Sequence, residues 1–430
     1  MIRAQVPRSR LPKLLYGMMS DRGGAFADLA RRYPDGVTVP LPGRPLHVLN
    51  GPEAVKHVLV TAADRYEKGV GQAEARAGLG RGILTDEGET WLRARGSLGP
   101  WLRARRIQQH APAIHRHAVD SVTELAGPHP RRMPVDGLLA EYTLRCLATV
   151  LGVPAPHVAP ILEALDIVQD DAMFRVVTQD RIPAVLRPRA EQRLREARTV
   201  LDRAADEIIA AVGAAADTPD GSSPAWADRD GVISLLLAGY ETTSSTLAWA
   251  VDELSRRPAL ADALAEEREA ADDPTDDPAD LLRLMGQLRL TTAVIKEVLR
   301  LHPAVWLVSR RACRDDVVAG WPIRTGDDVC VVIAEVQQQG WAAPDLFDPA
   351  RFLTNDHGRY LPFGLGPRGC PGASLAHLEA TLWLAEASRR LTLRPALGRR
   401  TRALARMSMT TMPGTPYLIA RRSVARAVSA

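Results

Sequence analysis

The chain has 430 residues, of which 46% are hydrophobic and 25% charged, enough to bury a large core. Its 55 basic and 51 acidic side chains leave a formal net charge of only +4, and this near balance argues against a nucleic-acid-binding protein. No stretch is long and apolar enough for a membrane span, and the basic N-terminal residues lack the apolar core of a signal peptide, so we expect a cytoplasmic protein.

Two further features of the whole sequence limit its class. No glycine- or serine-rich linker and no internal repeat divides the chain, and we predict a single, mostly helical domain over residues 1–430. The cysteines show no CxxC or CxxH spacing, which argues against zinc, iron–sulfur and dithiol redox sites. They are Cys146, Cys313, Cys330 and Cys370.

Short β-strands and a basic cluster are predicted outside the central helices. Val, Ile and Leu stand between turn residues near 37–49, 329–333 and 416–420, which is typical of strands. In the first third of the chain the sequence gathers five arginines, Arg93, Arg95, Arg103, Arg105 and Arg106. They form either an ordinary solvated helix face or a docking patch for an acidic partner.

The segment from Gly231 to Pro258 predicts a long buried helix. It starts with the apolar run VISLLLAG and continues with a Thr- and Ser-rich stretch. Hydroxyls of this kind can bond to the carbonyl four residues back, so we expect an interruption midway, beside Gly239. A core helix with satisfied hydroxyls is the alternative. Glu241 favours a functional helix, because a carboxylate in such apolar surroundings is costly unless it is paired or used.

A second helix is predicted at about 284–301, ending before Pro303. Glu297 and Arg300 share one face of it. Such a pair alone is usually a surface ion pair worth about 0.2–0.5 kcal/mol, so its meaning depends on the motifs around it.

The ten residues from Phe363 to Gly372, FGLGPRGCPG, surround one cysteine with glycines, an arginine and the start of an apolar helix. Proline is tolerated at the first position of a helix, so Pro371 predicts that the Cys370 sulfur lies at a helix N-terminus. Unpaired N–H groups there lower the pKa of a thiol and stabilise it as a metal ligand. The alternative is a buried cysteine with a purely structural role.

The spacing of Phe363, Gly366, Arg368, Cys370 and Gly372 resembles the haem-binding loop of the cytochrome P-450 family. The resemblance implies that Cys370 is the axial ligand of haem b. It also implies the fold, which would be mainly α with small β-sheets, a triangular helical domain around a buried haem.

Further motifs between residues 85 and 385 resemble the same family. The run from Ala238 to Thr243 resembles its oxygen-activating motif, which assigns Glu241 and Thr242 as the acid and the alcohol of a proton relay. General acid catalysis of this kind is worth roughly 10²- to 10⁴-fold in rate.

A buried structural triad is also implied by the resemblance. Its members are Glu297, Arg300 and Arg351. Breaking such a buried pair costs about 3–5 kcal/mol, so mutants should lose haem rather than turn over slowly.

Residues from several segments complete the cofactor site that the resemblance implies. Trp91 and Arg95 would hold a propionate, because an indole N–H donates and a guanidinium clamps a carboxylate. Arg310 or Arg311 would add a contact, and we assign it to Arg311. The expected haem contacts are Trp91, Arg95, Arg311, Phe363, Gly364, Arg368, Cys370 and Gly372.

The expected substrate pocket is largely apolar, with Trp306 adding a broad flat face. Apolar walls bury lipophilic ligands, and an aromatic wall suits rings or prenyl-like surfaces. The expected lining residues are Ile83, Met173, Phe174, Ala238, Val305, Trp306 and Thr410. One stretch departs from the family: relatives usually carry a His or Asn, Arg, Asp, Pro turn where residues 335–341 read EVQQQGW, which leaves the local turn and nearby partner contacts open.

The implied function is a monooxygenase that hydroxylates or epoxidises a lipophilic small molecule in secondary metabolism. Electrons derived from NAD(P)H would arrive through a separate ferredoxin or flavodoxin and its reductase. We expect a monomer that binds neither nucleic acid nor a membrane. The alternatives are a haem-thiolate enzyme that couples or closes rings without net oxygen insertion, a non-catalytic haem-binding protein, and an interaction protein in which Cys370 is structural.

Overall fold

The computed structural model describes residues 4–41, 43–126, 131–133, 135–153, 158–178, 182–215, 223–354, 358–395, 403–405, 411–413 and 417–421. Its helices are α1 (Leu11–Ser20), α2 (Arg22–Arg32), α3 (Pro52–Lys56), α4 (Gln72–Leu79), α5 (Gly88–Leu98), α6 (Ala104–Gln109), α7 (Ala111–Leu125), α8 (Asp136–Leu151), α9 (Val158–Thr178), α10 (Pro188–Ala215), α11 (Arg229–Ser255), α12 (Pro258–Ala270), α13 (Pro278–Gln287), α14 (Arg289–Leu301), α15 (Ile333–Val336) and α16 (Ala373–Arg390). Its strands are β1 (Gly36–Val39), β2 (Leu46–Leu49), β3 (Tyr66–Lys68), β4 (Arg131–Met133), β5 (Val308–Ala312), β6 (Asp316–Val318), β7 (Trp321–Ile323), β8 (Asp328–Val331), β9 (Leu391–Pro395), β10 (Ala403–Ala405), β11 (Thr411–Pro413) and β12 (Tyr417–Arg421). Helices dominate, and the predicted mainly α fold with small sheets is confirmed.

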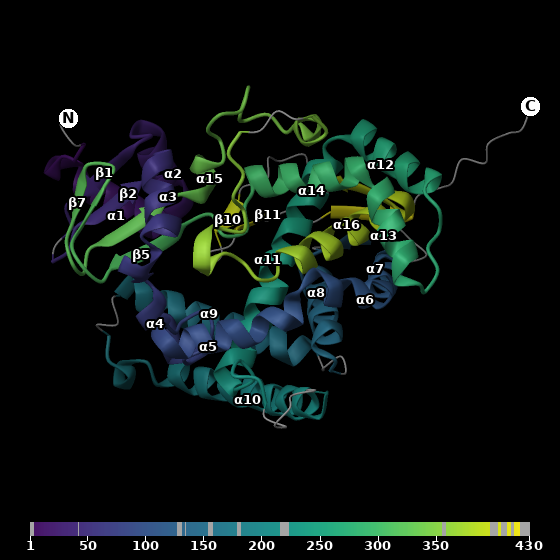
Figure 1. Cartoon of the computed structure of the whole chain (residues 1–430), viewed down its shortest axis with the longest axis horizontal. Coiled ribbons are helices and arrows are strands. Elements are labelled where there is room, and N and C mark those ends of the chain that lie inside the picture. The colour runs from purple at the N-terminus through teal and green to yellow at the C-terminus, as the bar shows by residue number, and fades with distance from the viewer. Residues whose placement is uncertain are drawn as a thin grey trace, which may run out of the picture.

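A five-stranded sheet lies at one side of the molecule, beside α1, α2 and α3, and most of the helices lie at the other (Figure 1). Its order is β1-β2-β8-β5-β3; β2 and β8 are parallel and the other neighbours antiparallel. The strands predicted near 37–49 and 329–333 are both in this sheet. The strand predicted near 416–420 is β12, which pairs with β4 and β9.

Helix α11 forms the centre of the helical part. Nearly all of its side chains from Gly231 to Ser255 are buried, and it packs against α8, α10, α14 and α16, as an apolar surface on all sides requires. The predicted interruption is wrong, since α11 runs unbroken from Arg229 to Ser255. The expected back-bonding does occur: the Thr242 hydroxyl donates to the carbonyl of Ala238 at 2.8 Å.

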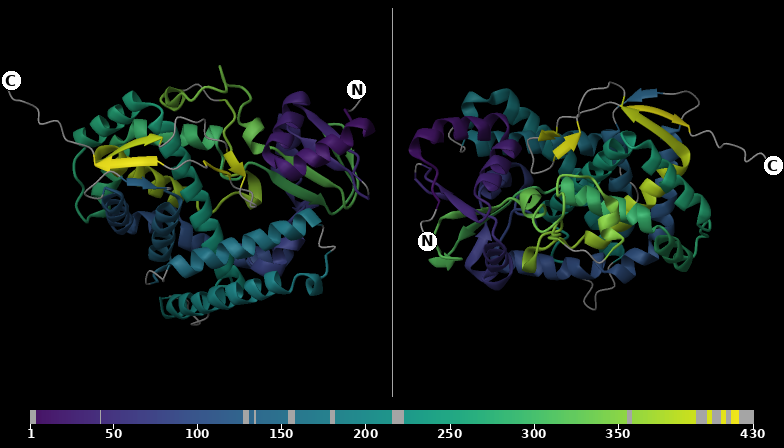
Figure 2. Two further views of the ribbon diagram at one scale, coloured as in Figure 1. Left: turned by 180° about the vertical axis from the view of Figure 1, so that it is seen from behind. Right: turned by 90° about the horizontal axis from the view of Figure 1, so that it is seen from above.

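The helices around α11 form layers. Helices α9 and α10 pack along each other on one side and appear together in both views of Figure 2. On the other side α16 packs against α7, α12 and α14. The helix predicted at 284–301 is two helices, α13 and α14, because the backbone of the buried Leu288 leaves the helical region (φ −81°, ψ 55°).

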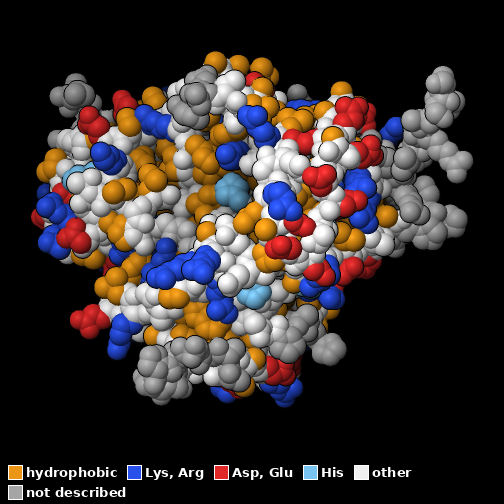
Figure 3. Space-filling model, turned by 45° about the vertical axis from the view of Figure 1, so that its right-hand side comes forward, with side chains coloured by type: hydrophobic (Ala, Val, Ile, Leu, Met, Phe, Trp, Pro, Cys, Tyr) orange, Lys and Arg blue, Asp and Glu red, His pale blue; other side chains and the backbone are white. Residues whose placement is uncertain are grey.

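Charge is spread over the surface. On the face shown in Figure 3, acidic and basic side chains are interspersed with apolar ones. Within the described ranges no helix is long and apolar enough to cross a membrane.

Candidate functional site

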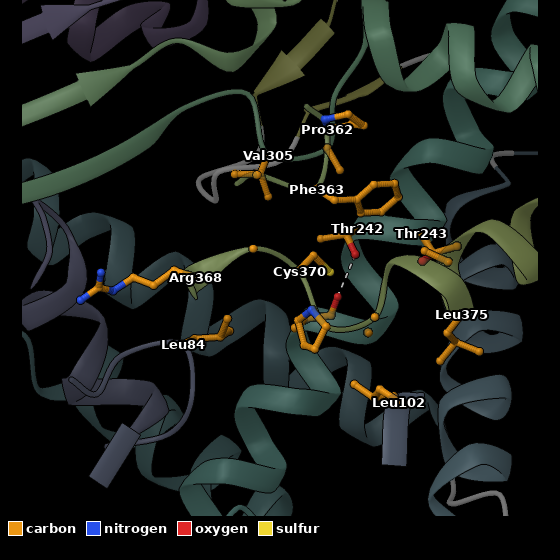
Figure 4. A pocket seen from close by; sticks show the side chains of 18 of the residues that line it. Leu84, Leu102, Thr242, Thr243, Val305, Pro362, Phe363, Arg368, Cys370 and Leu375 are labelled. Atoms are coloured by element: carbon orange, nitrogen blue, oxygen red, sulfur yellow. Dashed lines mark hydrogen bonds between the residues drawn. The ribbon is translucent and has the colours of Figure 1, made fainter. Parts of the chain in front are cut away.

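A cavity of about 330 Å³ opens between α11, the loop before α16 and the segments near residues 83–102 and 304–310 (Figure 4). Its wall on α11 includes Ala238, Gly239 and Thr242, and the loop contributes the run from Pro362 to Gly372 except Gly366 and Pro367. The cavity therefore brings together segments that are more than 200 residues apart in the sequence.

The loop that carries Cys370 depends on two glycines with left-handed backbone. Gly364 has φ +68° and Gly366 φ +70°, and a Cβ on Gly366 would meet the Leu59 carbonyl oxygen at 2.0 Å. The Cys370 N–H donates to the carbonyl of Phe363 at 2.8 Å, which closes the loop. Cys370 lines the cavity, as the sequence pattern predicts.

The predicted position of the sulfur at a helix N-terminus is wrong by a few residues. Helix α16 begins at Ala373 with Gly372 as its N-cap, so Pro371 lies in the turn before it. Burial raises the pKa of the Cys370 thiol, and the Gly372 N–H and Arg95 oppose this only in part. A coordinating metal ion would lower this pKa and hold the sulfur as a thiolate.

Positive side chains gather at one end of the cavity, beside the Trp91 ring. Arg95 on α5 donates to the Gly369 carbonyl, next to the cysteine. Lys68 donates to the carbonyls of Ile83 and Asp86 at 2.7 Å, and burial lowers the pKa of its ammonium to about 8. Sequence reasoning missed Lys68, because it lies alone on the short strand β3 with no motif around it.

Arg368 lies farther from the cysteine than its place in the loop suggests. Its guanidinium makes a bidentate contact with the Glu87 carboxylate at 2.8 and 3.1 Å, and it donates to the carbonyls of Ala63 and Tyr66. Figure 4 shows this side chain pointing away from Cys370. Arg368 lines the cavity and also ties the loop to the start of α5.

Of the two candidate arginines, Arg310 lines the cavity and Arg311 does not. Successive side chains of a strand point to opposite faces. Arg311 accordingly forms an ion pair with Asp328 at 3.0 Å, away from the cavity, whereas Arg310 is 9% exposed and lines it. Burial lowers the pKa of Arg310 to about 10.

These side chains fit a flat, dianionic cofactor. Among the described residues no carboxylate forms an ion pair with Arg310, whose guanidinium donates to the Ser309 carbonyl. An uncompensated buried cation is costly, so Arg310, Lys68 and Arg95 together call for an anionic ligand. The two propionates of haem b would supply it, while Cys370 would meet the iron in the apolar part of the cavity. The residue set therefore fits a haem.

The two predicted relay residues face different ways. Thr242 lines the cavity (Figure 4), whereas Glu241 is 5% exposed and is not part of the cavity wall. With the Gln169 amide turned to satisfy both of its ends, its nitrogen lies 2.9 and 3.1 Å from the two Glu241 carboxylate oxygens. The Glu241 carboxylate is thus held toward α9, whereas Thr242, the next residue in the sequence, faces the cavity.

A second buried carboxyl group belongs to Glu379 on α16. Unlike Glu241, Glu379 lines the cavity. Burial raises its pKa well above the ordinary value, and a hydrogen bond with Thr243 opposes the shift only in part. The sequence carried only a weak signal for it, because Glu379 is one of two acids, with Glu386, among the apolar positions of the helix after Cys370. The raised pKa favours the protonated form of Glu379, whose partner Thr243 directly follows Thr242.

Three of the residues expected in the substrate pocket line the cavity, and others do not. Ile83, Ala238 and Val305 line the cavity. Trp306 does not: it is 5% exposed and packs against Phe26 near the five-stranded sheet, with ring centroids 5.9 Å apart. Phe174 is also outside the wall, with its ring under the Arg187 guanidinium at 3.9 Å. Thr410 and the side chain of Met173 lie outside the described part of the chain.

Glu297, Arg300 and Arg351 come together as the triad pattern predicts. Glu297 and Arg300 form a bidentate pair at 2.7 and 2.8 Å, with both side chains fully buried, and Arg351 approaches Glu297 at 3.5 Å. The Glu297 carboxylate also accepts from the Asp348 N–H at 2.8 Å. The triad thereby ties α14 to the segment that leads to the cysteine loop.

The departing stretch EVQQQGW still forms a turn, at residues 337–340, and its glutamine side chains bridge neighbouring segments. Gln337 donates to the carbonyls of Leu299 and Arg300 and accepts from the Leu361 N–H at 2.9 Å. Gln338 accepts from Arg300 at 3.1 Å. These glutamines connect the end of α14 to residues 359–361 and so help to fix the start of the cysteine loop.

The arginine cluster is smaller than the sequence indicates. Arg95 lines the cavity, and the Arg106 guanidinium lies over the Trp101 ring at 4.2 Å. Arg93, Arg103 and Arg105 remain exposed. Because Arg95 on α5 touches the loop residue next to Cys370, the exposed Arg93 lies on the helix that borders the cysteine loop.

Comparison with known proteins points to a family whose members bind haem, in agreement with the residues of this site. The chain matches the Cytochrome P450 family over residues 11–220 and 229–420. It is 31% identical to cyclooctatin synthase from Streptomyces melanosporofaciens, over 88% of this chain and 87% of that protein. It is 30% identical to human mitochondrial 25-hydroxyvitamin D-1 alpha hydroxylase, over 74% of this chain and 71% of that protein.

A solved structure is similar over almost the whole fold. The crystal structure of a six-coordinated cytochrome P450 from Thermus thermophilus has a TM-score of 0.74 to this chain and 26% sequence identity. The likeness covers 94% of this chain and 99% of that one.

Proposed function

The chain belongs to the cytochrome P450 family and is a haem-thiolate monooxygenase, and we propose that its substrate is a neutral, mainly aliphatic small molecule. The observation that supports this substrate is the composition of the cavity wall away from the cationic end. Its described residues there are aliphatic or small: Ile83, Leu84, Leu98, Leu235, Ala238, Gly239, Ala304, Val305 and Val308. Trp306 lies outside the cavity, and the aromatic side chains of the described wall, Trp91 and Phe363, lie at the cationic end and in the cysteine loop, where the haem would bind.

This wall offers little to a charged or aromatic substrate. The cationic side chains Lys68, Arg95 and Arg310 lie where the propionates would bind, so they are not free to pair with a substrate carboxylate. Burial of aliphatic surface stabilises binding by about 25 cal/mol per Å², which favours an alicyclic or branched hydrocarbon skeleton. The likeness to a synthase from Streptomyces supports a role in secondary metabolism.

The protein's own part in the reaction is to bind, orient and deliver protons. Haem iron, when bound at Cys370, supplies oxygen activation. The Thr242 hydroxyl, which donates to the Ala238 carbonyl in this structure, turns to give its proton into the cavity and is recharged from Glu241. The aliphatic wall excludes water and so limits the release of reduced oxygen as peroxide.

The electron source in this proposal is a separate, acidic ferredoxin or flavodoxin. Arg93 is exposed on α5, whose Arg95 contacts the cysteine loop, and Arg103 and Arg105 are exposed just after it in the sequence. Reversing their charges (to Glu) should slow reduction by a ferredoxin more than tenfold at low salt, because steering by charge raises association rates by about 10–10³. The control reverses Arg193, Arg195 and Arg203, which are equally exposed on α10.

A binding screen tests the proposed substrate class. Cyclododecane, a neutral diterpene hydrocarbon, palmitic acid and naphthalene are titrated against the holoprotein, and the haem absorption shift is followed. We expect cyclododecane and the diterpene hydrocarbon to bind most tightly. When turnover is run under isotope-labelled dioxygen, we expect one labelled oxygen atom in their products. Tighter binding of palmitic acid or naphthalene would contradict the proposed class. Product without the label would favour the coupling or ring-closing alternative.

A further inference from the structure

Gln169 on α9 is part of a polar chain that begins at Glu241 and ends at the surface. The Glu241 carboxylate and the Tyr240 hydroxyl belong to neighbouring residues of α11, and both residues are almost fully buried, at 5% and 2% exposure. The Gln169 amide lies between them. The Tyr240 hydroxyl also lies 3.4 Å from Asp166 Oδ1, and Asp166 is exposed.

The Gln169 amide fits in two orientations. With its nitrogen toward Tyr240, it lies 3.0 Å from that hydroxyl. Turned over, its nitrogen faces both Glu241 oxygens at 2.9 and 3.1 Å, and its oxygen accepts from Tyr240 at 3.0 Å. The two ends of a side-chain amide have nearly the same size, so the change requires no repacking.

Each orientation suits one protonation state of the acid. When Glu241 is charged, the amide N–H groups bond to the carboxylate, and Tyr240 donates to the amide oxygen. When Glu241 is neutral, its O–H donates to the amide oxygen, the amide N–H donates to Tyr240, and Tyr240 donates to Asp166. Glu241, Gln169 and Tyr240 each keep at least one partner in both states, and the exposed Asp166 can turn to solvent, which avoids the cost of an unsatisfied buried group.

We propose that Gln169 is a positioning residue that holds Glu241 in both its charged and its neutral form by turning its amide over. This rests on the proposed role of Glu241 as the acid of the relay. A salt bridge at this place would hold only the charged form, since an arginine or lysine cannot accept the proton of the neutral acid. The neutral amide lets Glu241 pass a proton toward Thr242 and regain one while its backbone stays in place.

Infrared titration of the holoprotein tests the proposal. The carboxyl band that disappears in Glu241→Gln identifies the acid, and its midpoint is compared in wild type, Gln169→Met and Tyr240→Phe. Methionine keeps the length of glutamine but cannot donate. We expect the midpoint to rise by about 1–2 pH units in Gln169→Met, because the buried carboxylate loses a charge-assisted hydrogen bond, and by less in Tyr240→Phe. An unchanged midpoint in Gln169→Met would overturn the proposal.

A turnover measurement adds a second readout. With cyclododecane, NADPH and a ferredoxin and its reductase, Gln169→Met should give about tenfold less product per NADPH and a larger solvent deuterium isotope effect. The carbon monoxide spectrum and the melting temperature should stay as in the wild type. The control is Gln192→Met, which removes an exposed Gln–Glu hydrogen bond of 2.9 Å. Equal losses in both variants would contradict a positioning role.

The relay role of Glu241 and the positioning role of Gln169 can be tested separately. If Glu241→Gln itself leaves the product per NADPH unchanged, the relay assignment is wrong, whatever Gln169 does to the titration. If Glu241→Gln uncouples turnover and Gln169→Met leaves both titration and coupling as in the wild type, the relay stands and the role of Gln169 is wrong.

Discussion

Arg310 and Arg311 are neighbours on β5 whose guanidinium groups lie on opposite faces of the strand. Arg310 is buried at the edge of the cavity, and Arg311 forms an ion pair with Asp328 at 3.0 Å. A shift of one residue along β5 therefore separates a side chain that lines the cavity from one that makes a contact within the sheet.

This relationship predicts that the two arginines fail in different ways. Arg310→Met should lower haem affinity by about 10- to 100-fold, because a charge-assisted hydrogen bond to a propionate is lost. Arg311→Met should leave haem affinity unchanged and lower the melting temperature, because Asp328 loses its partner. Haem transfer to apomyoglobin and thermal unfolding measure the two effects. Equal haem loss in both variants would contradict the assignment.

The buried triad predicts a stability effect rather than a rate effect. Glu297→Gln should cost about 3–5 kcal/mol and yield mostly haem-free protein, because Arg300 keeps a buried charge without its carboxylate. The fraction that retains haem should turn over normally. Glu141→Gln is the control, since it breaks a half-exposed pair with Arg145 and should cost under about 1 kcal/mol. The measurement is the haem content per protein. Full haem occupancy in Glu297→Gln would show that the triad does not stabilise the cysteine loop.

Thr242→Ala should uncouple oxygen consumption from product formation. The cavity loses the hydroxyl that can donate a proton there, so more electrons leave as peroxide, with product per NADPH falling by about 10²-fold at most. Thr246→Ala is a matched control, because Thr246 also lines the cavity and bonds back to the carbonyl of Thr242 at 2.9 Å. Peroxide and product are measured together. Unchanged product per electron pair in Thr242→Ala would show that the relay assignment is wrong.

Glu379 predicts a pH dependence of stability. Burial raises the pKa of its carboxyl in the folded protein, so the folded state keeps a proton that the unfolded chain releases near pH 4.5. Its contribution to the free energy of unfolding is therefore complete below that pH and falls as the pH rises toward the folded pKa, by up to about 1.4 kcal/mol per pH unit. Glu379→Gln, which stays neutral, should remove this part of the slope.

Denaturant unfolding at pH 5, 7 and 9 checks the expectation. The difference in unfolding free energy between Glu379→Gln and wild type should grow in favour of the variant as the pH rises. Glu141→Gln, on the exposed face of α8, should run parallel to the wild type. Parallel slopes for Glu379→Gln would mean that this carboxyl is charged in the folded protein.

The cysteine loop and the pairing of Glu297 with Arg300 could be predicted from the sequence because each is a short run with fixed spacing. The Cys370 loop needs glycine at two left-handed positions, and Glu297 and Arg300 are one helical turn apart, so both features are visible in the chain itself. The strands of the main sheet were also visible, as runs of Val, Ile and Leu between turns.

The errors concern side-chain direction and contacts between distant segments. No local pattern tells which of Arg310 and Arg311 faces the cavity, since this depends on how β5 pairs with β8 and β3. Trp306 turns to Phe26, far from it in sequence, and was wrongly placed in the pocket. Lys68 reaches the site from a three-residue strand and was missed for the same reason.

The most direct test of the central claim is the absorption spectrum of the reduced, carbon monoxide-treated protein beside that of Cys370→Ser. We expect a strongly red-shifted Soret band in the wild type and its absence in Cys370→Ser, because Cys370 is the one cysteine among the described residues that line the cavity. The same band in both proteins, or no bound haem in the wild type, would contradict the claim that Cys370 holds a haem.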